Sequence, residues 1–476
     1  MKSPISILDI PLIQDQIALH LSTHDQVSCT LVCRAWSEVF NPILWKFIRI
    51  SSSIQQRRFI RVLESARYRS YTKTLATAFP LSSSLALPST VLPNLTTLKC
   101  RLNASCQQNE GIVETMFRFI QAHESLIRVQ LASLTVDDTF PGVFERCVKD
   151  HPSLTCLDLS IRGFISVEDL SKVWNNCTRL ERLRLRVATY MYYEDAPDIT
   201  LREPIEDLQD CRMKDFAIDQ EHRCVFDAIV LQFLKRCPLL EKLSLPLSKG
   251  ESTLVQLGPL LSAYCPRLQH LQLGSATQTG LAAVVKACTA GLLTLKMPLA
   301  CRNAVPIILE HRLTLTKLDL MTGMGLQSAA ELFSITNACP RLIDLALKIK
   351  FFDSGRDFVG AREEEGETLA RLLVQDWVCT KLENLTLELQ DCVTECPLLP
   401  YVEYMYRQLG RLTALRGLWI SFWKEGGILK LRQGFRANLQ SLAGLKELGR
   451  LRIDSVEPLS VEERTWITTQ WPGIKL

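Results

Sequence analysis

Long apolar runs are missing from this sequence of 476 residues. Its strongly apolar runs are short, such as the one from Ala228 to Leu231, whereas a membrane-spanning helix needs roughly 20 residues. The first residues carry one lysine and no apolar stretch of the kind that a secretory signal requires. We therefore expect neither secretion nor association with a membrane, and we expect the chain in the cytoplasm, the nucleus or both.

Catalytic signatures are missing as well. The sequence has no G-x-S-x-G turn for a nucleophile, no H-E-x-x-H zinc motif and no P-loop for a nucleotide. Histidine, the commonest acid–base residue, occurs only seven times. We therefore expect a protein that is not an enzyme and that needs no cofactor.

Neither sign of charge dominates the chain. Lysine and arginine number 55, aspartate and glutamate 51, and the net charge is +4. Proteins that bind nucleic acids or membranes through general electrostatics carry a much larger excess. Neither kind of partner is expected, and the distribution of charge is more informative than its sum.

Close pairs of metal ligands are few. The 17 cysteines are an odd number, which fits reduced thiols in an intracellular protein better than disulfides. Cys29 and Cys33, His20 and His24, and Cys392 and Cys396 could each present two zinc ligands on a helix. No C-x2-C unit accompanies them, so we expect no metal site.

Leucine, in contrast, is heavily used, with 78 copies in the chain. A Leu-x-x-Leu-x-Leu pattern recurs along it, and most copies start 23 to 33 residues after the previous one, close to the spacing of about 20–29 in leucine-rich repeats. Thirteen copies begin at Leu95, Leu126, Leu154, Leu180, Met213, Leu240, Leu268, Leu292, Leu315, Leu342, Leu382, Leu415 and Leu448.

Each copy predicts a short strand with one buried face, and helical patterns lie between the strands. Strand and helix units stacked in parallel form a curved α/β solenoid, with strands on its concave face and helices on its convex face. Most copies have a cysteine or histidine three residues before the first leucine, a slot suited to a small buried side chain. This slot holds Cys177, Cys237, Cys265, Cys339, Cys379, His123 and His151, with Cys288 one residue further away. The phasing resembles the cysteine-containing class of leucine-rich repeats.

The first fifty residues follow a different pattern. They contain Ile10-Pro11, then Val32-Cys33-x-x-Trp36, then Pro42-x-Leu44-Trp45. In this order and spacing the segment resembles an F-box. The stripe of Ile13, Ile17 and Leu21 and that of Cys29, Val32, Cys33 and Trp36 make a small helical unit with little core of its own, so we expect it to complete its burial against the first repeats or a partner. Cys33 is expected to pack in that core.

The predicted organisation has three parts. An all-α F-box-like domain spans residues 5–50, and a basic linking helix and loop follow over 51–92, with a possible degenerate first repeat around Leu75. The solenoid occupies 93–476 and ends in a cap, for which Ser460-Val461-Glu462-Glu463 supplies a capping-box pattern.

The F-box resemblance implies the substrate receptor of a Skp–cullin–F-box ubiquitin ligase. It implies that the segment binds a Skp-family adaptor, that cullin and RING subunits join through the adaptor, and that the repeats hold a target protein. The residues that it assigns to the adaptor are Ile10, Pro11, Ile17, Leu21, Leu31, Val32, Trp36, Pro42, Leu44 and Trp45. The alternatives are a leucine-rich-repeat scaffold or inhibitor whose N-terminal helices only cap the solenoid, an F-box protein acting outside the ligase, and a receptor whose solenoid holds a small cofactor.

Basic side chains gather at the polar strand positions of the early repeats. They predict a concave surface that grips an acidic or phosphorylated segment of the target, although exposed strand arginines can also be merely solvated. The basic positions are Lys99, Arg101, Arg128, Arg182, Arg184 and Arg186. Aromatic anchors are predicted at Tyr192 and Tyr193, in an inserted loop, and at Trp419, and a second acidic insertion covers 351–367.

Overall fold

The computed structural model spans the whole chain. It describes residues 11–63, 65–78, 91–101, 112–135, 148–149, 151–162, 174, 177–188, 210–220, 227–245, 251–274, 278–297, 304–321, 329–351, 375–391, 399–424, 438–455 and 458–474. The chain divides into two compact units, Met1–Ile229 and Val230–Leu476. We describe each unit by itself.

The first unit opens with helices and continues as a parallel sheet. Its helices are α1 (Pro11–His20), α2 (Thr23–Val32), α3 (Arg34–Lys46), α4 (Ser53–Leu63), α5 (Ala66–Tyr71) and α6 (Ile112–Gln121), with a 3-10 turn at Cys177–Arg179. Its strands are β1 (Phe47–Ile50), β2 (Thr74–Thr77), β3 (Thr97–Arg101), β4 (Arg128–Thr135), β5 (Cys156–Arg162), β6 (Arg182–Ala188) and β7 (Asp215–Gln220). Each strand pairs in parallel with the next in sequence order.

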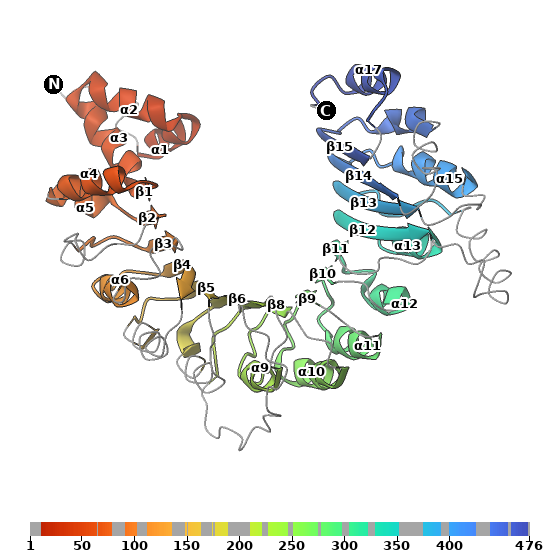
Figure 1. Cartoon of the computed structure of the whole chain (residues 1–476), viewed down its shortest axis with the longest axis horizontal. Helices are drawn as coiled ribbons and strands as arrows, with labels where there is room; N and C mark the ends of the chain where they lie inside the picture. The colour runs from red at the N-terminus through yellow and green to blue at the C-terminus, as the bar shows by residue number, and fades with distance from the viewer. Residues whose placement is uncertain are drawn as a thin grey trace, which may run out of the picture. The chain divides into compact units, whose positions relative to one another are not determined.

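The second unit repeats the strand-and-helix alternation. Its strands are β8 (Lys242–Leu245), β9 (His270–Leu273), β10 (Thr294–Lys296), β11 (Lys317–Leu320), β12 (Asp344–Phe351), β13 (Asn384–Asp391), β14 (Gly417–Lys424) and β15 (Arg450–Ser455). Its helices are α10 (Glu251–Tyr264), α11 (Gln278–Ala287), α12 (Ala304–Ile308), α13 (Ala329–Thr336), α15 (Leu399–Leu409) and α17 (Val461–Gln470), with 3-10 turns at Leu309–His311 and Leu439–Gly444. Helix α9 (Asp227–Leu234) spans the boundary between the units. In Figure 1 helices α10 to α15 lie along one face of these strands.

The repeat leucines build the core, because parallel register stacks equivalent positions on neighbouring strands. Leu75 pairs with Leu98, and Leu98 pairs with Val129. These side chains are fully buried, whereas the residue that follows Leu98, Lys99, is exposed. One strand face therefore carries the core and the other is open, which confirms the predicted α/β leucine-rich-repeat solenoid.

All thirteen predicted copies contain a strand, and two further strands precede them. Strand β2 contains Leu75, where a degenerate first repeat was considered possible. Strand β1 was not predicted as a repeat, yet Ile48 pairs with Leu75. Its sequence signal is Trp45-x-x-Ile48-x-Ile50, with tryptophan at the first apolar position.

The cysteine slot is buried, as predicted. The Cys237 thiol donates to the carbonyl of Phe233, four residues earlier, with an Sγ–O distance of 3.4 Å. His123 makes the equivalent contact, from Nδ1 to the carbonyl of Phe119 at 2.6 Å. Its Nε2 accepts the Leu92 N–H at 3.0 Å, so the proton is on Nδ1. Histidine therefore replaces cysteine by satisfying the same kind of carbonyl.

These buried thiols are expected to resist alkylation. Burial raises the pKa of Cys265, Cys288 and Cys379 to about 12, and only the thiolate is the nucleophile. In native protein at neutral pH, we expect iodoacetamide to modify the exposed Cys33 and to leave those three unmodified until the chain is unfolded. Peptide mass spectrometry measures the modification. Native-state modification of Cys265 as fast as that of Cys33 would contradict the buried slot.

The chain ends in the predicted cap. The Ser460 hydroxyl accepts the Glu463 N–H at 3.2 Å, and the Glu463 carboxylate accepts the Ser460 N–H at 2.7 Å, which forms a capping box at the start of α17. The Trp471 indole N–H donates to the carbonyl of Leu445 at 2.8 Å. This bond ties the cap to the last repeat.

Two findings concern the described residues as a whole. None of the described helices is long and apolar enough to cross a membrane. Within the same residues, no group of three or more His, Cys, Asp or Glu side chains gathers in a way that could hold a metal ion.

Candidate functional site

Helices α1, α2 and α3 form a small unit with few buried side chains. The Gln26 amide donates to the carbonyls of Ala18 at 2.8 Å and Leu21 at 3.2 Å, which ties α2 to the end of α1. On α3, Phe40 is fully buried and its ring lies 5.7 Å from that of Trp36. So small a core supplies little stability on its own.

The remaining burial comes from the first strand-and-helix unit. The Trp45 ring, at the end of α3, lies 4.8 Å from the Tyr68 ring on α5 and 6.5 Å from the Phe59 ring on α4. The Lys73 N–H donates to the carbonyl of Lys46 at 3.1 Å. Helix α3 therefore packs against the first repeats, which is one of the two outcomes that the sequence predicted, the other being burial against a partner.

Helix α2 has no buried residue, and three of its apolar side chains are exposed. Leu31 is 81% exposed, Val32 64% and Val27 46%, and we call these three residues the α2 apolar face. Val27 and Leu31 are four residues apart and so lie on one side of the helix. Nothing in the described part of the chain covers them, although exposed leucines and valines gain free energy when they are buried. The face has the composition of a binding surface.

The structure separates the residues assigned to the adaptor into two groups. Leu31 and Val32 are exposed, whereas the half-buried group consists of Ile17, Leu21, Trp36, Pro42, Leu44 and Trp45. Pro11 begins α1, and Ile10 lies outside the described residues. Sequence reasoning missed Val27, for which the four-residue spacing to Leu31 was the available signal.

Cys33, expected in the core, is exposed, so that prediction was wrong. It lies between α2 and α3 in an extended backbone conformation, which interrupts the helical stripe from which its burial was inferred. Next to it, Arg34 and Glu38 form an exposed ion pair at 3.2 Å. This junction is therefore open to solvent.

The predicted arginine surface on β6 is ion-paired. Arg182 and Arg184 contact the Asp215 carboxylate at 2.9 and 3.1 Å, and Arg186 contacts Asp219 at 3.1 Å. Both aspartates come from β7, which pairs with β6 in register. Two carboxylates of the next strand therefore pair with three arginines, which leaves less free positive charge on β6 than the sequence suggested, and an anion-binding role for these arginines stays a prediction.

A carboxylate on β5, the strand on the other side of β6, also lies close to the β6 arginines. Asp158 of β5 pairs with Arg184 in the sheet. Burial raises the pKa of Asp158, and the nearby Arg184, Arg186 and Arg182 oppose that rise. The arginines of β6 therefore lie between acidic side chains on both neighbouring strands.

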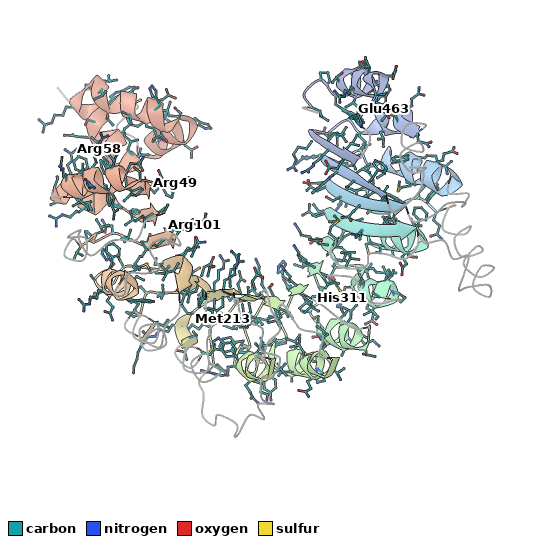
Figure 2. All side chains as sticks on the ribbon, in the orientation of Figure 1. Arg49, Arg58, Arg101, Met213, His311 and Glu463 are labelled. Atoms are coloured by element: carbon teal, nitrogen blue, oxygen red, sulfur yellow. The ribbon has the colours of Figure 1, made fainter. Side chains whose placement is uncertain are left out.

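Further positive charge lies on the first four strands. Strands β1 to β4 contain no Asp or Glu, and their exposed basic residues are Arg49, Lys99, Arg101 and Arg128. Figure 2 places Arg49 and Arg101 at β1 and β3. An acidic target segment stays a prediction for this part of the surface.

The predicted aromatic anchors differ in outcome. Tyr192 and Tyr193 lie outside the described residues, as does the second insertion beyond Phe351. Trp419 of β14 is half-buried, and its indole N–H donates to Asp454 of β15 at 2.9 Å. Phe422, three residues further along β14, is buried in the core.

The chain was compared with protein families, curated proteins and solved structures. Residues 13–51 match the family described as F-box-like. Among solved structures, the leucine-rich repeat-containing protein LegL7 from Legionella pneumophila matches with 14% identity and a TM-score of 0.33, over 78% of this chain and 97% of that one. No curated protein matches. The chain therefore combines a segment similar to the F-box-like family with the repeat strands and helices that follow it.

Proposed function

We propose that this chain is the substrate receptor of a Skp–cullin–F-box type of ubiquitin ligase. In this role the F-box-like helices bind a Skp-family adaptor, the adaptor joins cullin and RING subunits, and the repeats hold a target protein. The observation that carries the proposal is the α2 apolar face, which is exposed on the same segment that matches the F-box-like family.

The face is suited to a protein partner. Removing one leucine or valine side chain from water contributes about 1.5–3 kcal/mol, and three such side chains grouped on one helix can form the centre of an interface. The exposed ion pair of Arg34 and Glu38 follows the face in the sequence, at the start of α3, and polar residues of this kind form the rim around interface cores. A largely apolar groove on an adaptor would complement this arrangement.

The chain would contribute to the reaction by proximity. A receptor that holds its target beside a charged ubiquitin-conjugating enzyme raises the effective concentration of a target lysine at the thioester. The bond-forming chemistry then belongs to other subunits. A chain that binds the target while other subunits carry out the reaction agrees with the general role of F-box and leucine-rich-repeat families as non-catalytic adaptors.

A capping role alone explains less of the structure. The contacts of Trp45 with Phe59 and Tyr68 join α3 to the first repeats, as they would in a scaffold whose helices only close the solenoid. A cap with a polar outer face is what such arrays need for solubility. Leu31 and Val32 place apolar side chains on that outer face instead, which favours a partner.

Direct binding to an adaptor tests the proposal. The full-length chain and a purified Skp-family adaptor are mixed, and the complex is measured by size-exclusion chromatography with light scattering. We expect an equimolar complex that then recruits the cullin scaffold. A full-length chain that is folded by circular dichroism and does not bind the adaptor would leave the scaffold role as the better explanation.

A further inference from the structure

Positive charge is concentrated in residues 46–101, from the last residue of α3 to the last residue of β3. This segment contains ten lysines and arginines and one acidic residue, Glu64, so its net charge is +9. The whole chain carries only +4, which leaves the other residues with a net charge of −5. The segment is therefore strongly basic, a property that the net charge of the chain conceals.

Helix α4, within this segment, carries apolar and basic side chains on opposite faces. Phe59 is buried, and its ring lies 6.5 Å from that of Trp45. Arg57, Arg58 and Arg61 are exposed, and Figure 2 shows Arg58 on this helix. Because Arg57 and Arg58 precede Arg61 by four and three residues, all three lie on one side of the helix. The packing of Phe59 therefore holds the arginines toward solvent.

An apolar side chain lies on the same side of α4. Ile54 is 62% exposed, and it precedes Arg57 by three residues and Arg58 by four. The Ser52 hydroxyl accepts the Gln55 N–H at 3.2 Å, which fixes the first turn of the helix. Ile54 is therefore held beside the arginines. We give the name α4 basic face to Ile54, Arg57, Arg58 and Arg61.

The α4 basic face has one sign of charge. The helix contains no acidic residue, and no carboxylate of a described residue forms an ion pair with its three arginines. Other exposed cations of the first unit do have such partners, as in the pairs of Arg34 with Glu38 and of Lys214 with Glu181, both at 3.2 Å. The face is therefore suited to an anionic partner from outside the described chain.

An anionic lipid bilayer matches both properties of the face. Its surface carries negative headgroups, which attract clusters of arginine on a helix, and guanidinium groups bind phosphates through parallel hydrogen bonds. Beneath the headgroups lies an apolar layer that Ile54 can enter. A nucleic acid offers phosphates without such a layer, and protein surfaces mix charges of both signs. The combination of clustered arginines and an exposed isoleucine therefore favours the bilayer.

We infer that the α4 basic face binds the surface of an anionic lipid bilayer. The binding is peripheral, because α4 stays packed on the first repeats through Phe59 while its arginines contact headgroup phosphates. The inference goes beyond the proposed receptor function and does not depend on it. A receptor held in this way would meet its targets at a membrane surface.

Vesicle co-sedimentation tests the inference with the full-length chain and without adaptor. Vesicles of phosphatidylcholine alone are compared with vesicles of phosphatidylcholine and phosphatidylserine in equal parts. We expect the chain to sediment only with the second kind, and to be released at an ionic strength of about 1 M, where the Debye length is about 3 Å. Equal sedimentation with both kinds, sedimentation with neither, or binding that survives the salt would overturn the inference.

Variants locate the binding on α4. The triple variant Arg57→Gln, Arg58→Gln and Arg61→Gln should weaken binding to the anionic vesicles about a hundredfold, since each arginine near such a surface contributes about fivefold. Ile54→Ser should weaken it several-fold and leave its response to salt unchanged. Wild-type affinity in the triple variant would place the bilayer contact elsewhere on the chain.

The matched control removes the same charge from the second unit. Arg267, Arg341 and Arg464 are exposed there, and their joint replacement by glutamine should leave vesicle binding at the wild-type level. Circular dichroism checks that both triple variants are folded. Equal losses in the two variants would show that binding follows net charge alone and would refute the assignment to α4.

Other anionic partners are outcomes of the same measurements. A double-stranded DNA oligonucleotide, an RNA oligonucleotide and a polyglutamate peptide are each compared with the anionic vesicles at equal concentrations of negative charge. We expect the vesicles to bind most tightly. Tighter binding of an oligonucleotide or of polyglutamate, lost in the α4 triple variant, would assign the face to a nucleic acid or to an acidic protein instead.

Discussion

Replacing Leu31 and Val32 together with aspartate is expected to abolish adaptor binding while leaving the fold intact. Both side chains are more than half exposed, and surface substitutions usually change stability by less than about 0.5 kcal/mol. In a complex the same positions would bury two carboxylates against an apolar partner. Such a loss at the centre of an interface should weaken binding by about a hundredfold or more, measured by isothermal titration calorimetry.

The control uses the same residue types elsewhere on the chain. Leu313 is 63% exposed and Val461 77% exposed, and both lie far along the sequence from the F-box-like segment. The double variant Leu313→Asp with Val461→Asp should bind the adaptor with the affinity of wild type. If both double variants bind equally well and melt at the same temperature, the α2 apolar face is not the adaptor surface.

The repeat architecture could be predicted because each repeat depends on its own leucines. A strand that stacks between two others must bury the side chains at alternate positions, so the spacing of Leu98 and Cys100 is copied at Leu157 and Leu159. Strand β1 was missed because Trp45 occupies the first apolar position. That tryptophan has two roles, since it lies in the last turn of α3 and its ring packs on Tyr68 of α5.

The orientation of the F-box-like helices could not be predicted in the same way. The pattern Val32-Cys33-x-x-Trp36 is compatible with an inward or an outward position for Val32, because the rotation of a helix about its axis is fixed by its neighbours. Here Trp36 contacts Phe40 while Val32 is exposed. The motif identifies the segment, and only the structure identifies its free face.

The pairing of the arginine strand was hidden for a different reason. Asp215 lies 33 residues after Arg182, and the two meet because β6 and β7 align at these positions. The degenerate repeat at Met213 already contained this register, so an alignment of the repeats could have paired the charges. Judging each strand alone therefore overlooked the two aspartates of β7 that pair with the arginines of β6.

Glycine at position 410 is expected to be essential for the last repeats. The end of α15 packs directly on the 3-10 turn Leu439–Gly444, where a Cβ atom on Gly410 would overlap the carbonyl oxygen of Ser441, and one on Gly444 would overlap that of Gly410. In both cases the added Cβ atom would meet backbone, which cannot move aside as a flexible side chain could. Gly410→Ala should therefore lower the free energy of unfolding by about 3 kcal/mol.

The loss should be local, because each repeat of a solenoid contacts only its neighbours. Hydrogen exchange should rise in α15, β14 and β15 and stay unchanged in β8 to β10, a distinction that a global melting curve does not make. Gly473→Ala is the matched control, since its new Cβ meets no atom within 4 Å, and it should exchange like wild type. Wild-type exchange in α15 of Gly410→Ala would show that the two backbones can separate without cost. The same variant should still bind the adaptor with the affinity of wild type, because Gly410 lies in the second unit and the α2 apolar face in the first.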